Sequence, residues 1–170
     1  MSTHQISLTV DGQDRSLTVE GRTLLVHALR DTLDITSPKI GCDTSKCGAC
    51  TVELDDEIVK SCTVLAVQAD GKSIQTVADR SDTSIRETVK NAFHDHHAIQ
   101  CGYCTSGMII SVSDFLETNP NPSRDEITRA LKGNICRCTG YVNIIRAVEA
   151  ASRQLSEPPE HELSQSGVGE

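Results

Sequence analysis

The sequence of 170 residues lacks tryptophan and is poor in other aromatic side chains, with two Tyr and two Phe. Aromatic side chains normally supply much of the buried area of a protein core. A chain of this length has room for one full domain or two small ones, and small cores gain limited stability from burial. We therefore expect bound metal to supplement the packing.

Three further features are absent. No basic run occurs and the net charge is −8, which argues against a nucleic-acid surface. No stretch approaches 18 consecutive apolar residues, so we expect no membrane span. Residues 1–13 lack the basic start, apolar stretch and cleavage site of a secretory signal. The sequence therefore predicts a cytoplasmic protein, where clustered cysteines stay reduced and more often bind metal.

Eight cysteines are present, and they form two sets of four. The first set is spaced C-x4-C-x2-C-x11-C and consists of Cys42, Cys47, Cys50 and Cys62. The second set is spaced C-x2-C-x31-C-x-C and consists of Cys101, Cys104, Cys136 and Cys138. The first spacing matches the plant-type ferredoxin pattern for a 2Fe–2S cluster.

The surroundings of the first set favour the same interpretation. Gly41 and Gly48 lie beside cysteines, where glycine lets the backbone wrap closely around an inorganic core and aim N–H groups at its sulfurs. Such hydrogen bonds raise the reduction potential. Cys62 lies in an apolar stretch and would fix the loop to a sheet. A four-cysteine zinc site is the alternative, although zinc sites usually show two short C-x2–4-C knuckles.

The second set is less diagnostic, because its spacing is compatible with zinc as well as with iron–sulfur ligation. Cys101 and Cys104 precede one expected helix, and Cys136 and Cys138 precede another. Helix N-termini favour an anionic centre. Arg137 would add a positive charge there, or would be an ordinary solvated loop residue.

Residues 1–78 read as a small mixed α/β unit. Alternating residues predict strands at 5–10 and 15–19 around the turn Asp11-Gly12, and a second hairpin at 51–54 and 57–59. Thr23 is expected to cap a helix that runs to residue 33, and residues 61–67 and 73–77 are expected to be extended. This order makes a β-grasp, ferredoxin-like 2Fe–2S domain the expected fold.

Residues 82–155 read as four helices, expected at 84–96, 105–118, 123–133 and 141–154. Ser123 and Glu126 form a capping-box pattern for the third. Short connections suggest a four-helix bundle, which would hold the second set. The whole chain is therefore expected to be α+β, with residues 156–170 as a disordered tail.

Four stretches together resemble the small iron–sulfur subunit of the molybdenum hydroxylases, the family of xanthine dehydrogenase, aldehyde oxidoreductase and aerobic carbon monoxide dehydrogenase. These stretches are GCDTSKCGAC, SCTVLAVQADG, IQCGYCTSGMI and GNICRCTGYVNI. The likeness spans about residues 4–153, and the first two stretches are most similar to carbon monoxide dehydrogenase small subunits. Ser106 departs from the family pattern, which usually has Pro at that position.

The resemblance implies a subunit that relays electrons from molybdopterin through two 2Fe–2S clusters to FAD and is not catalytic alone. The first set would hold the cluster far from molybdenum, and the second set the cluster near it. Gln100 would contact the molybdopterin, and Cys138 would lie on the electron path toward the pterin. The implied partners are a large molybdopterin-binding subunit and a medium FAD-binding subunit, assembled as a dimer of heterotrimers. Carbon monoxide, an aldehyde or an N-heterocycle would be the substrate.

Two other functions stay open, a free-standing redox carrier or sensor and a structural zinc protein. His94, His96 and His97 are interpreted as a polar helix end, because each set already has four cysteines. Residues 55–57 are interpreted as a solvated hairpin tip. Thr105, Ser106 and Ser111 have no evident base partner, so nucleophilic catalysis has no support.

Overall fold

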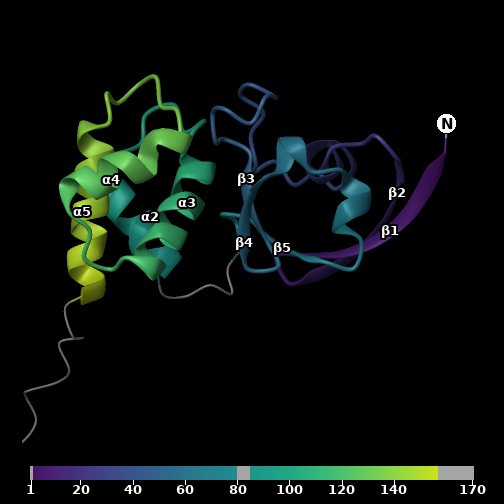
Figure 1. The fold of residues 1–170 in the computed structure, drawn as a ribbon, viewed down its shortest axis with the longest axis horizontal. Helices are drawn as coiled ribbons and strands as arrows, with labels where there is room; N and C mark the ends of the chain where they lie inside the picture. Colours follow the sequence, from purple (N-terminus) through teal and green to yellow (C-terminus); the bar gives the residue numbers. More distant parts are fainter. Residues whose placement is uncertain (1, 80–84, 157–170) are drawn as a thin grey trace, which may run out of the picture.

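The computed structural model describes residues 2–79 and 85–156, which form a five-stranded sheet followed by a group of helices (Figure 1). The predicted α+β architecture is confirmed. Ser84, the expected start of the first helix of the second half, lies outside the described residues, as does the expected tail except for Ser156. Among the described helices, none has the length and apolar character needed to cross a membrane.

The sheet consists of β1 (Thr3–Val10), β2 (Gln13–Glu20), β3 (Thr51–Leu54), β4 (Glu57–Lys60) and β5 (Ser73–Gln75). The strand order is β2-β1-β5-β3-β4, in which β1 and β5 run parallel and the other neighbours run antiparallel. Both predicted hairpins are present. Their turn residues Asp11, Gly12, Asp55 and Asp56 all have positive φ, as a two-residue turn matched to the strand twist requires.

One face of the sheet is covered by short helical segments. These are α1 (Leu25–His27), the π turn η1 (Ala28–Thr32) and two 3-10 turns, η2 (Ser61–Thr63) and η3 (Ala66–Ala69). Alternate residues of the strands point toward them, which explains the period-two pattern of the sequence. The resulting core contains Ile6, Leu8, Val10, Leu17, Val19, Leu25, Ala28, Leu29, Val52, Ala66, Ala69 and Ile74.

Two local predictions in this half were wrong. Thr23 does not cap the first helix, because Leu24 is the N-cap and pairs as an extended residue with Leu65. Residues 61–67 are not one extended segment, because η2 and η3 turn the chain so that Cys62 and Ala66 are buried. A short apolar run fits a strand or a turn equally well, and packing against α1 decides here.

The helical half consists of α2 (Ile85–Asp95), α3 (Thr105–Thr118), α4 (Arg124–Ala130) with the 3-10 turn η4 (Leu131–Gly133), and α5 (Val142–Ser156). The capping box at α4 is confirmed, since Ser123 N donates to Glu126 Oε2 at 2.8 Å. The core of the helical half includes Val89, Phe93, Met108, Ile109, Val112, Leu116, Ile127, Leu131, Ile144 and Val148. α3 faces the sheet and contacts β3 and β4 (Figure 1).

A buried ion pair joins the two halves. Arg86 of α2 donates from Nη2 to Glu53 Oε2 of β3 at 2.6 Å, and the side chain of Arg86 is only 4% exposed. A charge in this position is stabilised by its partner because water is largely excluded. The pair therefore fixes the orientation of α2 on the sheet.

We expect Arg86→Met to lower the free energy of unfolding by about 3 kcal/mol, because it removes the guanidinium that lies beside a buried carboxylate. The double variant Glu53→Met/Arg86→Met should regain most of this loss, since neither charge then has to be desolvated. Urea unfolding of the full chain measures both. A double variant at least as unstable as Arg86→Met would contradict the interpretation.

Candidate metal centres

The loop before β3 curls around the thiol of Cys42. Backbone N–H groups of Thr44, Lys46 and Cys47 donate to Cys42 Sγ at 3.4, 3.3 and 3.3 Å. Asp43 and Ser45 adopt positive φ, which turns successive N–H groups inward. The Thr44 hydroxyl and these N–H groups lower the pKa of Cys42 to about 6, so the sulfur is a thiolate at neutral pH.

Cys50 and Cys62 form a buried pair beneath this loop. Both lie in an apolar cluster with Val26, and their residues are 3% and 5% exposed. The neighbouring Ser61 donates to the Cys50 carbonyl through its hydroxyl, at 2.7 Å, and through its backbone N–H. Burial raises the pKa of Cys50 to about 11. A bound metal deprotonates such a thiol outright, so loading this pair releases protons.

The second set is brought together from two loops of the helical half. Cys104 is the N-cap of α3, and Cys136 and Cys138 lie between η4 and α5. The sulfurs of Cys138 and Cys101 are 3.5 Å apart in an exposed pair. Burial, and then a hydrogen bond with Cys136, raise the pKa of Cys104 to about 12, which marks these two as an inner pair.

The pairwise arrangement fits a 2Fe–2S core. Such a core takes two thiolates on each iron. The second set is divided into an exposed and an inner pair, and the first set into the loop residues Cys42 and Cys47 and the buried pair below them. Among the described residues, no group of three or more His, Cys, Asp or Glu side chains is arranged to hold a single metal ion. The ligand assignment itself remains a prediction.

Tyr141 and Thr139, which the sequence did not single out, form hydrogen bonds with Cys136 of the second set. The Cys136 N–H donates to the Tyr141 hydroxyl at 2.8 Å, and this hydroxyl donates to the Asn134 carbonyl at 3.0 Å. Thr139 Oγ1 lies 3.2 Å from Cys136 Sγ. Burial raises the pKa of Cys136, but hydrogen bonds from Thr139, the Cys138 backbone and Cys104 together lower it. Tyr141 has φ of +66°, so α5 begins one residue later than predicted.

The two sets meet where glycines allow backbone to touch backbone. A Cβ on Gly107 of α3 would lie 2.0 Å from the Gly48 carbonyl oxygen. A Cβ on Gly48 would lie 2.3 Å from Asn134 Oδ1. Across this contact Ile135 N–H donates to the Cys47 carbonyl at 2.8 Å. One residue and one hydrogen bond therefore separate Cys136 from Cys47.

Three of the remaining predicted residues are exposed. Gln100 is exposed directly before Cys101. Arg137 is exposed between Cys136 and Cys138. His94 lies beside Asp95 at the exposed end of α2.

The hairpin tip at residues 55–57 is exposed, as predicted, and hydrogen bonds hold one of its carboxylates. Asp55 accepts from Ser73 N at 2.8 Å and pairs with Lys72 at 2.6 Å. These two partners, Lys72 first, lower the pKa of Asp55. Its carboxylate therefore ties the β3–β4 turn to β5 while remaining at the surface.

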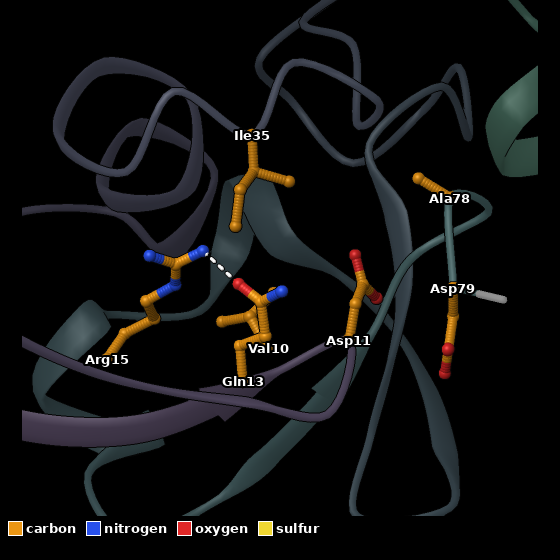
Figure 2. Close-up of a pocket in the computed structure, with 7 residues that line it drawn as sticks. All are labelled: Val10, Asp11, Gln13, Arg15, Ile35, Ala78 and Asp79. Atoms are coloured by element: carbon orange, nitrogen blue, oxygen red, sulfur yellow. Dashed lines mark hydrogen bonds between the residues drawn. The ribbon is translucent and has the colours of Figure 1, made fainter. Parts of the chain in front are cut away.

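A cavity of about 450 Å³ lies apart from the cysteines, beside the β1–β2 turn (Figure 2). Three of its polar side chains have partners within the domain: Arg15 donates to Gln13, and Asp11 accepts from the Thr76 backbone and hydroxyl. No cysteine lines it. The lining residues are Val10, Asp11, Gln13, Arg15, Ile35, Ala78 and Asp79.

Comparison with known families gives two matches that together cover most of the chain. Residues 8–73 match the 2Fe-2S iron-sulfur cluster binding domain, and residues 74–149 match the [2Fe-2S] binding domain. Both descriptions concern 2Fe–2S binding, in the same two halves that carry the two cysteine sets.

Similar proteins of known name share nearly their full length with this chain. The nicotine 6-hydroxylase small subunit of Paenarthrobacter nicotinovorans is 44% identical, over 89% of this chain and 91% of that protein. The caffeine dehydrogenase subunit gamma of Pseudomonas sp. (strain CBB1) is also 44% identical, over 89% and 93%. A chain in the crystal structure of quinoline 2-oxidoreductase from Pseudomonas putida 86 superposes with a TM-score of 0.82 at 42% identity, covering 91% of this chain and 96% of that one.

We expect Gly107→Ala to lower the free energy of unfolding by about 1–3 kcal/mol, because the added methyl group overlaps the Gly48 backbone. Exchange of the Ile135 amide proton should accelerate as its bond to Cys47 weakens. Gly133→Ala is the matched control, since its Cβ would meet only Lys60 Nζ at 3.7 Å. Equal effects of the two substitutions would contradict the close contact.

Proposed function

The chain belongs to the family of small iron–sulfur subunits of the molybdenum hydroxylases, and from this membership we propose how its own residues relay electrons within such an oxidoreductase complex. Two 2Fe–2S clusters, when bound, would each accept and release one electron, between a molybdopterin subunit and an FAD subunit. Cys42, Cys47, Cys50 and Cys62 would hold the cluster far from molybdenum. Cys101, Cys104, Cys136 and Cys138 would hold the near one. The observation that carries this proposal is the contact between the two sets.

That contact supplies a short route through backbone bonds and one hydrogen bond. Cys136 is bonded to Ile135, whose N–H donates to the carbonyl of Cys47 at 2.8 Å. The route joins a candidate ligand of one set to a candidate ligand of the other through protein backbone. Because the backbone is held by close glycine packing, its geometry is rigid. The eight thiolates act as ligands, and no described residue of this chain has to attack a substrate.

The exposed surface around the second set supports docking to a partner rather than a free-standing carrier. Large apolar side chains that are exposed mark interaction sites when they cluster. Four of the five that occur among the described residues lie within four positions of a cysteine of this set, namely Ile99, Tyr103, Ile135 and Val142. Cys101 and Cys138 are exposed among them. We propose that this face meets the large molybdopterin-binding subunit, with Cys138 on the path toward the pterin.

The medium FAD-binding subunit would then meet the exposed loop around Cys42, which belongs to the first cysteine set. A dimer of such heterotrimers is the proposed assembly, and a reducing cytoplasm is the proposed location, since it keeps the thiols available for iron. Residues 1–78 would form the domain of the far cluster, and residues 82–155 the domain of the near one.

The relatives do not support carbon monoxide as the substrate. The two curated relatives described above are named for nicotine and caffeine, and the solved structure for quinoline, which are N-heterocycles. We propose an N-heterocycle as the substrate of the complex. The substrate would react on the large subunit.

Metal analysis and low-temperature EPR of the complex, purified through a tag on this chain, test the proposal. We expect four irons for each copy of this chain and two distinct one-electron-reduced signals, together with molybdenum and flavin from co-purifying larger chains. Zinc with almost no iron would refute the electron-transfer function. Two clusters in a chain that purifies alone would favour the free carrier.

Single-cysteine variants test the order of the two centres. We expect Cys47→Ser to remove one EPR signal and to stop flavin reduction, while substrate still reduces molybdenum and the remaining cluster. Cys136→Ser should remove the other signal and separate molybdenum from both remaining centres. Stopped-flow absorbance and freeze-quench EPR measure these steps. Normal flavin reduction in Cys136→Ser would refute the assigned order.

Gln100 provides a separate test of pterin contact, because its exposed amide directly precedes Cys101. We expect Gln100→Ala to slow cluster reduction by substrate or to weaken retention of molybdopterin, at unchanged iron content. Gln68→Ala, on η3 of the other domain, is the control. Unchanged molybdopterin content together with an unchanged reduction rate would count against the contact.

A further inference from the structure

Lys60 lies where the two domains that carry the cysteine sets are in contact. It is the last residue of β4, with Cys62 two positions further along the chain. Its Nζ donates to the Gly133 carbonyl at 3.2 Å and to Thr51 Oγ1 at 3.4 Å. Gly133 belongs to the segment that leads to Cys136. The ammonium group therefore contacts the supports of both sets.

The second contact connects Lys60 to the first cysteine loop. Thr51 Oγ1, which accepts from Lys60, donates to the Gly48 carbonyl at 2.7 Å. That carbonyl is the one packed against Gly107 of α3. Lys60, Thr51 and Gly48 thus form a chain of contacts that begins at the ammonium and ends at the junction of the two domains.

The charge of Lys60 has no carboxylate beside it. Both of its acceptors are neutral oxygens, and none of the ion pairs found among the described residues includes it. The residue is half-buried, so solvent and salt screen the charge less than they screen a fully exposed lysine. The positive charge is therefore fixed in place by neutral groups and remains available to act on nearby negative charge.

We propose that Lys60 raises the reduction potentials of both 2Fe–2S clusters, an inference that rests on the function proposed above. Reduction adds one electron to a thiolate-bound centre that is already anionic. A cation fixed nearby stabilises the reduced form more than the oxidised form. Because Lys60 adjoins both sets, it acts on both potentials together.

A redox titration of the intact complex, followed by EPR, tests this role. We expect Lys60→Met to lower the reduced-to-oxidised ratio of both clusters about tenfold at a fixed potential, which is 59 mV for a one-electron couple. Lys60→Arg should keep both midpoints close to the wild-type values, because it preserves the charge. Lys60→Gln gives a second neutral variant if the Met variant does not assemble.

Lys72→Met is the matched control for net charge. Lys72 forms an ion pair with Asp55 at the tip of the β3–β4 hairpin. Lys60 lies at the open end of the same hairpin, opposite Thr51, which follows Cys50. We expect unchanged midpoints in this variant. Thermal unfolding of each complex shows whether a neutral variant has also weakened the contact between the two domains.

The possible results distinguish the role of Lys60 from the electron-transfer function on which it rests. Two normal clusters whose midpoints do not move in Lys60→Met and Lys60→Gln overturn the role of Lys60 and leave electron transfer intact. An equal drop in Lys60→Arg or Lys72→Met overturns it as well, because the fixed charge would then not be the cause. A wild-type complex without reducible diiron sites overturns both.

Discussion

The arrangement of the two cysteine sets depends on a contact in which no side chain intervenes. The Gly48 carbonyl lies directly against α3 at Gly107, and the Asn134 side chain fills the space that a Cβ on Gly48 would occupy. Interiors are packed so closely that even one methyl group has to be accommodated by movement. Any larger residue at either glycine would separate the loops. The hydrogen bond from Ile135 to Cys47, the contact of Lys60 with Gly133 and the position of Tyr103 all follow from this approach.

Tyr103 shows how the contact spreads outward from the glycines. Its hydroxyl donates to the Ile40 carbonyl at 2.7 Å, two residues before Cys42. The same side chain lies between Cys101 and Cys104 in sequence. The buried pair of Arg86 and Glu53 holds α2 on β3. Polar contacts therefore surround the glycine junction and oppose rotation of one half on the other.

The sequence predicted those features that local chemistry decides. The turn residues Asp11-Gly12 and Asp55-Asp56 located both hairpins, and the Ser123–Glu126 pattern located α4. Cysteine spacing divided the thiols into the two sets. The failures at Thr23 and at residues 61–67 arose because an apolar run of that length fits a strand or a turn, and burial against α1 decides between them. Roles of Tyr141, Thr139 and Lys60 depend on contacts between segments far apart in sequence, which no local pattern encodes.

The protonation chemistry of the thiols links assembly to metal loading. In the first set the Thr44 hydroxyl and then backbone N–H donors lower the pKa of Cys42, whereas burial raises the pKa of Cys50. In the second set hydrogen bonds, first from the Tyr103 N–H, lower the pKa of Cys101, and the pKa of Cys136 is lowered as well, whereas burial raises the pKa of Cys104. A low-pKa thiolate can capture iron first, and the metal then displaces the proton from the buried thiol. Apolar burial of thiols is costly for their charge unless metal neutralises it. Metal ligation, when it occurs, would add an energy of assembly to two cores that have few aromatic rings.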